Sequence, residues 1–246
     1  MRISKDEPLG RATVEAIQHG DVGTLKRLLT EHPGLAAARI DSGANACEPP
    51  TNTRSLLHIA TDWPGHFSNG AAIVAMLVEA GADVNAQFTG RHTETPLHWA
   101  ASSDDIEVLD ALLDRGADIE APGAVIGGGT PLSDAVAFGQ WRAARRLIER
   151  GARANLCQAA ALGLMDRVRQ FFDDTVAPPA AEVTKAFWCA CHGGQRQSAE
   201  YLQERGAEVN WVGFEDLTAL DAARRSGAED LASWLEARGA KSTRQR

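Results

Sequence analysis

The stretch Thr95-Pro96-Leu97-His98-Trp99-Ala100 decides the fold, because variants of it return along much of the chain. Similar stretches begin at Ser55, Thr130 and Thr218. In each, a hydroxyl residue is followed by a leucine two residues later and by an alanine five residues later. A Ser or Thr favours the position just before a helix, and a Pro fits its first turn, where no N–H group is needed. The pattern therefore predicts a series of short helices that begin alike.

A second signal, a Gly-Ala pair, follows these stretches at a regular distance. The pair occurs at Gly81, Gly116, Gly151, Gly206 and Gly239, at intervals of 35, 35, 55 and 33 residues. A fixed period of this length is typical of repeat proteins. The interval of 55 residues is long enough to hold an additional, weaker unit.

Three columns support one repeat register, counted from the first residue of each unit. The sixth position is always alanine: Ala16, Ala60, Ala100, Ala135, Ala159, Ala190 and Ala223. The tenth is a residue that tolerates a left-handed, helix-ending backbone: Gly20, Asn69, Asp104, Gly139, Gly163, Gly194 and Gly227. The eighteenth is large and apolar: Leu28, Leu77, Leu112, Leu147, Phe171, Leu202 and Leu235. The columns predict about seven helix-turn-helix units, which start near residues 11, 55, 95, 130, 154, 185 and 218.

The openings resemble the T-P-L-H-x-A signature of the ankyrin-repeat family, over roughly residues 11–240. The resemblance implies an all-α solenoid in which β-hairpin fingers project beside a concave groove. We expect residues 1–246 to form a single ankyrin-repeat domain with a short polar tail at 241–246. The resemblance also implies a non-enzymatic module for protein–protein interaction, because the family is used mainly to bind other proteins.

The chain departs from a regular repeat in three places. Only Ala152-Arg153 separates Gly151 from the fifth unit, so no finger fits there, and a bend or gap is expected near residues 150–182. The second unit carries about five extra residues within Thr61–Gly70. A long loop rich in Pro, Gly and Asn, Pro33 to Arg54, separates the first two units. Insertions in repeat arrays map to surface loops and often to the binding face.

Composition excludes several classes of function. The net charge is −8, from 25 Lys and Arg against 33 Asp and Glu, which disfavours nucleic acid and anionic membrane surfaces as partners. No window approaches 18 apolar residues without charge, and the first residues carry no signal peptide pattern. The four cysteines, at positions 47, 157, 189 and 191, form no CxxC pair. These features predict a soluble, unprocessed protein of the cytoplasm.

Apolar and aromatic residues at loop positions indicate where a partner binds. Between residues 61 and 135 twelve acidic residues face only two arginines, which favours a basic partner. The predicted partner-binding residues lie on this segment: Trp63, His66, Phe67, Phe88, Arg91, His92, Val125 and Ile126. Trp211 and Phe214 occupy similar loop positions in the last unit.

Two alternatives to a protein partner stay open at this level. The loops of Trp63, His66 and His92 could form a metal-dependent or small-ligand site, although no spacing enforces their convergence. Between residues 136 and 170, seven arginines face two acids, and this patch of the fourth and fifth units could take a phosphate-bearing ligand. No G-x-S-x-G or H-E-x-x-H motif is present, so neither an enzyme, a cofactor nor a bound metal is predicted.

Overall fold

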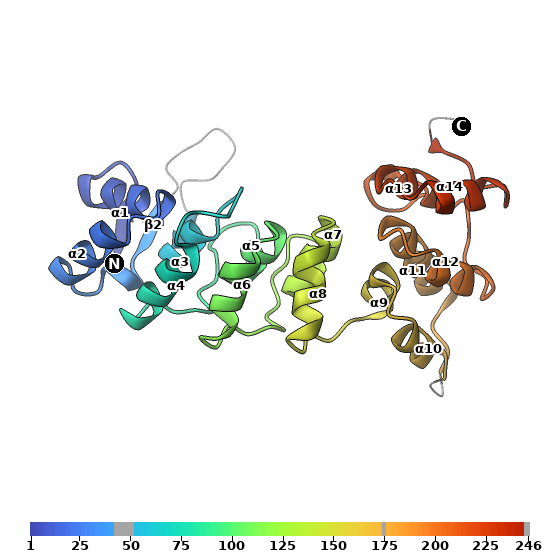
Figure 1. Cartoon of the computed structure of the whole chain (residues 1–246), viewed down its shortest axis with the longest axis horizontal. Helices are drawn as coiled ribbons and strands as arrows, with labels where there is room; N and C mark the ends of the chain where they lie inside the picture. The colour runs from blue at the N-terminus through green and yellow to red at the C-terminus, as the bar shows by residue number, and fades with distance from the viewer. Residues whose placement is uncertain (42–51, 174–175, 244–246) are drawn as a thin grey trace. The chain divides into compact units, whose positions relative to one another are not determined.

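The computed structural model describes residues 1–41, 52–173 and 176–243, and the chain forms two compact units, Met1–Ala152 and Arg153–Arg246 (Figure 1). The first unit contains α1 (Pro8–Gln18), α2 (Val22–Glu31), η1 (Leu35–Ala37), α3 (Leu56–Ala60), α4 (Gly70–Glu79), α5 (Pro96–Ser102), α6 (Ile106–Leu113), α7 (Pro131–Ala137) and α8 (Trp141–Glu149). The second contains α9 (Leu156–Leu162), α10 (Met165–Asp173), α11 (Ala180–His192), α12 (Arg196–Gln203), η2 (Phe214–Asp216), α13 (Ala219–Arg225) and α14 (Glu229–Glu236). The predicted all-α series of helix pairs is confirmed.

The first helix starts with a reciprocal cap in five of the pairs, at α3, α5, α7, α9 and α13. In α3 the His58 N–H donates to Ser55 Oγ at 3.3 Å, and the Ser55 N–H donates back to His58 Nδ1 at 3.3 Å. The His58 Nε2–H then donates to the Glu94 carbonyl oxygen at 3.0 Å, which ties the helix to the loop of the next unit. His98 repeats this arrangement from Thr95. Such caps satisfy N–H groups that a helix start would leave without partners.

The alanine column marks where each first helix ends. In six units the alanine carbonyl accepts a hydrogen bond from the backbone N–H five residues later, and the residue between the helices has a positive φ, as in a Schellman motif. The accepting residues are Ala16, Ala100, Ala135, Ala159, Ala190 and Ala223. All are at most 4% exposed. The second repeat differs because its insertion follows α3, but Asn69 still adopts a φ of 57° just before α4.

The Gly-Ala pairs end the second helices by the same geometry. Each glycine has a φ between 78° and 100°, and the alanine N–H after it donates to the carbonyl of the leucine at position eighteen. The donors are Ala82, Ala117, Ala152, Ala207 and Ala240. A residue with a side chain rarely adopts this left-handed backbone conformation, which accounts for the glycine at these positions.

A small sheet at the N-terminal end was not predicted. β1 (Arg2–Ser4) pairs in parallel with β2 (Arg39–Asp41), which pairs antiparallel with β3 (Thr53–Ser55). The segment expected to be one long loop, Pro33 to Arg54, therefore contains η1, β2 and most of β3, while residues 42–51 lie outside the described part. Ile3 and Ile40 face each other in the sheet and are buried. Three-residue strands are too short to show a periodic pattern, which is why sequence reasoning missed them.

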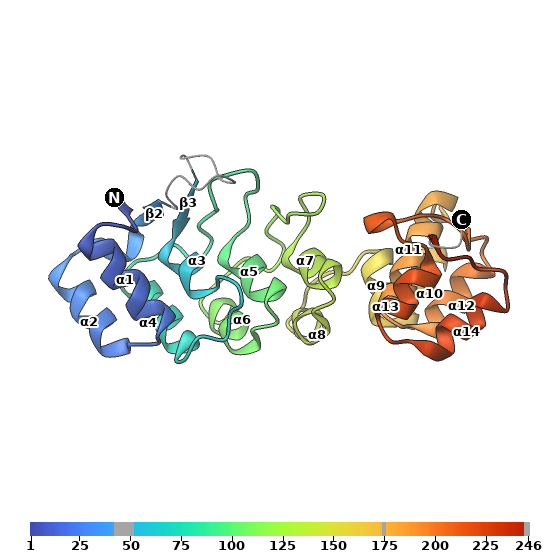
Figure 2. The ribbon, with the colours of Figure 1, turned by 90° about the horizontal axis from the view of Figure 1, so that it is seen from above.

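In the first unit, the loops before α5 and α7 project together from one side of the helices (Figure 2). The first of these fingers is held by the Phe88 N–H, which donates to the Glu94 carbonyl at 2.7 Å. The second is closed by hydrogen bonds from the Gly123 and Ala124 N–H groups to the carbonyls of Gly128 and Gly129. The glycine-rich segment thus serves a tight turn.

The second unit has its core around α11. This helix packs against α9, α12 and α13. It begins at Ala180, five residues before the predicted start of the sixth repeat near residue 185. Trp188 Nε1–H donates to the Leu217 carbonyl at 2.9 Å, and Phe214 packs edge-on against the Trp188 ring at 5.1 Å. Trp211 in turn contacts Phe214. Trp211 and Phe214, the loop aromatics predicted for the last repeat, therefore pack within the second compact unit. The bend expected near residues 150–182 stays a prediction.

Candidate functional site

The candidate site is a pocket of about 180 Å³ in the first unit. It lies between the insertion after α3, helix α5, the second finger and the end of α7. We call it the α5–α7 pocket, and its lining residues are Thr61, Asp62, Trp63, Glu94, Trp99, Ser102, Ser103, Val125 and Phe138. Its volume is of the order of six water molecules, which suits one long side chain.

Aromatic and apolar side chains form the walls of this pocket. Trp63 is 81% exposed, Phe138 49% and Val125 42%. Trp99 is only half-buried, but its ring is held by His58, edge-on with centroids 4.9 Å apart, and by Phe88 at 5.6 Å. One wall is therefore fixed by packing, while Trp63 offers a large exposed surface.

Two buried carboxyl groups bear on the pocket, and one of them is part of its lining. Glu94 lines it and is 6% exposed, whereas Asp134, on α7, is fully buried. The charge of Glu94 acts on the Asp134 carboxyl and favours its protonated form. Among the described residues, neither Oδ atom of Asp134 accepts a hydrogen bond of ordinary geometry from an N–H or O–H donor. Asp134 thus lacks a cationic partner.

Burial dominates the ionisation of this carboxyl pair. Burial and the adjacent Glu94 charge raise the pKa of Asp134 to about 8, and the backbone amide of Val125 lowers it only slightly. Burial also raises the pKa of Glu94, against smaller lowering contributions from Trp99, Asp134 and His92. Near neutral pH Asp134 therefore mostly keeps its proton.

One cation already lies beside the pocket. Arg54 forms an ion pair with Asp62, and its guanidinium carbon lies 5.9 Å from the centroid of the Trp99 ring. Asp62 therefore offsets the charge of Arg54 at the rim. Glu94, the other acidic residue of the lining, is buried.

The predicted partner-binding residues are only partly brought together. Trp63 and Val125 line the α5–α7 pocket, and Ile126, 45% exposed, follows Val125 on the same finger. Phe88 is half-buried against His58 and Trp99. The remaining four lie around the insertion and the first finger: His66 and Arg91 are exposed, and Phe67 and His92 are half-buried.

The histidines of the proposed metal-dependent alternative have different surroundings. The His66 backbone N–H donates to Asp105 Oδ2 at 2.7 Å, and its ring Nε2 lies 3.0 Å from the Ser103 carbonyl. His92 lies near Glu94, where its charge lowers the pKa of that carboxyl. Within residues 1–41, 52–173 and 176–243, no three His, Cys, Asp or Glu side chains form a group that could hold a metal ion.

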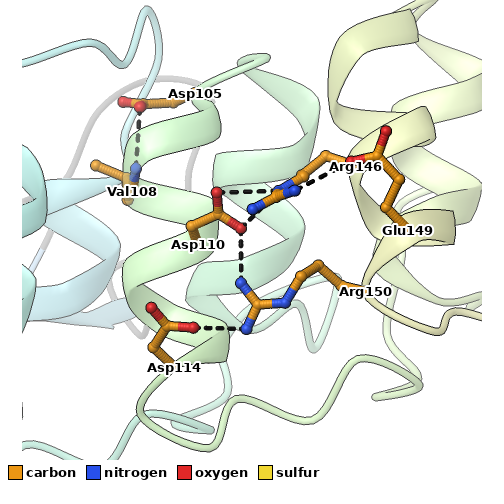
Figure 3. Close-up of polar contacts among 7 residues, drawn as sticks. All are labelled: Asp105, Val108, Asp110, Asp114, Arg146, Glu149 and Arg150. Atoms are coloured by element: carbon orange, nitrogen blue, oxygen red, sulfur yellow. Dashed lines mark hydrogen bonds and ion pairs between the residues drawn. The ribbon is translucent and has the colours of Figure 1, made fainter.

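The arginines of α8 are paired with acids of α6 (Figure 3). Arg146 Nε lies 2.9 and 3.0 Å from the two carboxylate oxygens of Asp110, and Arg150 binds Asp110 at 2.7 Å and Asp114 at 2.6 Å. Burial raises the pKa of Asp110, but hydrogen bonds from both arginines outweigh it and lower the pKa overall. Much of the sequence contrast between an acidic and a basic segment is thus neutralised between neighbouring helices.

The predicted site residues did not include Glu94, Trp99 and Phe138, which line the α5–α7 pocket, or Asp134, on whose carboxyl Glu94 acts. A signal was available, because Trp99 and Asp134 both occupy position five of their repeats. Equal positions of adjacent repeats lie side by side, and α5 packs directly against α7. Comparing the chain column by column would have placed these side chains together.

In the part of the chain that the structure describes, no helix is both long and apolar enough to cross a membrane. Residues 13–123 and 69–158 match the family model for ankyrin repeats in three copies. The chain is 28% identical to an ankyrin repeat and KH domain-containing protein of Caenorhabditis briggsae over 177 residues, 68% of this chain and 7% of that protein. It is 30% identical to the palmitoyltransferase Hip14 of Drosophila melanogaster over 105 residues, 43% of this chain and 14% of that protein. The chain therefore spans only a small part of both relatives. With helix pairs, caps and glycine ends repeated in one register, and with more than half of its length matched, the chain belongs to the ankyrin-repeat family.

Proposed function

We propose that this chain is a non-enzymatic module that binds a protein or peptide with basic side chains across the α5–α7 pocket and the adjoining fingers. Ankyrin repeats generally mediate protein–protein interactions. One observation carries the finer proposal: Trp63, Val125 and Phe138, all large and exposed, line one pocket together with Glu94. Aromatic anchors near the centre of an interface supply much of its binding energy. A location in the cytoplasm stays a prediction.

The arginines of α8 are a weaker candidate for the binding site than the pocket. A phosphate-bearing ligand there would have to displace Asp110 and Asp114 from Arg146 and Arg150, whose hydrogen bonds are already formed. An acidic side chain among aromatic anchors, as in the α5–α7 pocket, favours a basic partner through charge complementarity, which acts mainly on encounter and orientation.

The test is a peptide array in which the number of lysines and arginines is varied, probed with the full chain. Binding should rise with basic content and fall at least about fivefold in Trp63→Ala, the effect of an anchor worth about 1 kcal/mol. The control is Val176→Ala, which changes an exposed apolar side chain of the second unit and should bind like the wild type. Raised salt should slow association more than it speeds dissociation. The proposal is refuted if Trp63→Ala binds normally while substitution of Arg146 and Arg150 abolishes binding.

A further inference from the structure

We propose that the α5–α7 pocket receives a single lysine or arginine side chain of the partner, whose positive charge is balanced by Glu94 and the buried Asp134. The inference rests on the proposed function, because it identifies the chemistry of one contact within that interface. Its observations are the aromatic walls, the buried carboxyl pair and the lack of a cationic partner for Asp134.

The walls suit a cation on a long apolar stem. A lysine or arginine places its methylene groups against apolar surface while its charged end seeks polar groups. Trp63 and Trp99 can also attract the charge through their ring faces. Arg54 already lies over Trp99, so the largely exposed Trp63 ring is the face with room for an incoming cation. The pocket's volume of about 180 Å³ fits one side chain and is far too small for a helix.

The floor of the pocket supplies the counterion. Glu94 lines the pocket, and its charge acts on the buried carboxyl of Asp134. A buried carboxyl without a donor is costly when ionised, so in the free protein Asp134 keeps its proton. A positive charge beside Glu94 favours the ionised form of both groups. Binding therefore lowers the pKa of Asp134, and its proton passes to solvent.

Other charged groups near Glu94 and Asp134 also influence the binding of a cation in the pocket. Asp62 and Arg54 form an ion pair at the rim, and His92 acts on Glu94 through its charge. A His92→Gln variant separates the contribution of His92 from that of Asp134.

The probe is a short peptide of glycine and serine that carries one lysine, compared with peptides that carry arginine or the uncharged isostere norleucine. Nuclear magnetic resonance of the full chain follows the indole N–H signals of Trp63 and Trp99 and the carboxyl carbons of Glu94 and Asp134. At pH 7 the lysine and arginine peptides should shift both indoles and move the Asp134 carboxyl toward its ionised position. The norleucine peptide should bind at least tenfold more weakly.

Affinity for the lysine peptide should rise up to tenfold per pH unit and level off above the free pKa of Asp134, about 8. His92→Gln should keep this rise. Asp134→Asn, which keeps the side chain's shape, should still bind but lose the rise. Amide spectra of each variant establish that it is folded.

The inference is overturned if lysine and norleucine peptides bind equally, or if the Asp134 carboxyl does not change while the indoles shift. It is also overturned if neither indole shifts with any peptide. In these cases the proposed function still stands if basic sequences on the peptide array bind in a way that depends on Trp63. If that dependence is also lacking, both proposals fail.

Discussion

Replacing Asp134 with asparagine should stabilise the protein in neutral and alkaline solution, although it removes a buried polar group of the native chain. In the unfolded chain this carboxyl ionises at its ordinary pKa near 3.8, whereas in the fold its pKa is about 8. Between these values the folded state binds more protons than the unfolded state. The free energy of unfolding therefore falls as pH rises through this window.

The magnitude follows from the width of the window. Each pH unit costs up to about 1.4 kcal/mol, and relaxation of the site reduces the full effect by roughly half. We expect Asp134→Asn to be about 2–3 kcal/mol more stable than the wild type at pH 8 and to differ little at pH 4. An asparagine is uncharged at every pH, so it removes the cost of ionising a buried carboxyl at this position.

The assay is urea unfolding of the wild type and the variant at a series of pH values from 4 to 9. The difference between the two curves isolates Asp134, because other titrating groups are common to both. A matched control is Asp114→Asn, whose half-exposed ion pair with Arg150 should contribute at most about 1 kcal/mol. Parallel stability curves for wild type and Asp134→Asn would refute the reasoning.

Three further predictions concern the scaffold. Ala135→Leu should destabilise the fold by about 1–3 kcal/mol in thermal melts, because this alanine is fully buried; an unchanged melt would mean that the repeat register is wrong. Burial lowers the pKa of His58 to about 3 and of His98 to about 4, so both stay neutral in the fold; stability should be lost as pH falls from about 6.5 to 4, and a His58→Gln variant should lose less of it. Phe88→Ala should lower both the melting temperature and partner binding, because its ring supports Trp99, whereas Trp63→Ala should lower binding alone; equal melts for the two variants would contradict this.

The repeated core could be predicted because its rules are local. A cap, a small residue where helices touch and a left-handed residue at a helix end each act within one unit, and the chain repeats them. Ala100 and Ala135, for example, end their helices by the same bond. The small sheet escaped prediction because β1 and β2 pair across more than thirty residues of chain and contain only three residues each.

The charges show where the sequence-based prediction was incomplete, because it compared charges along the chain and not between neighbouring repeats. Counting net charge by segment separates an acidic stretch from a basic one. In the structure, Asp110 and Arg146, 36 residues apart, meet because their separation is close to one repeat length. The same step brings Arg150 to Asp114. Charges in a repeat protein are therefore better compared at equal positions of adjacent units.

The same comparison separates what holds the fold from what recognises a partner. Position five is Ile59, Trp99 and Asp134 in three successive units, so the scaffold accepts an aliphatic, an aromatic or an acidic side chain there. The fold consequently does not require the unpaired carboxyl of Asp134, which lowers stability. A chain whose caps, turns and core agree at each level is expected to break its own rules mainly at functional sites. Asp134 is such an exception, because its carboxyl is buried without a hydrogen-bond partner. The cation of a partner in the aromatic pocket would offset the loss of stability that this carboxyl causes in the free protein.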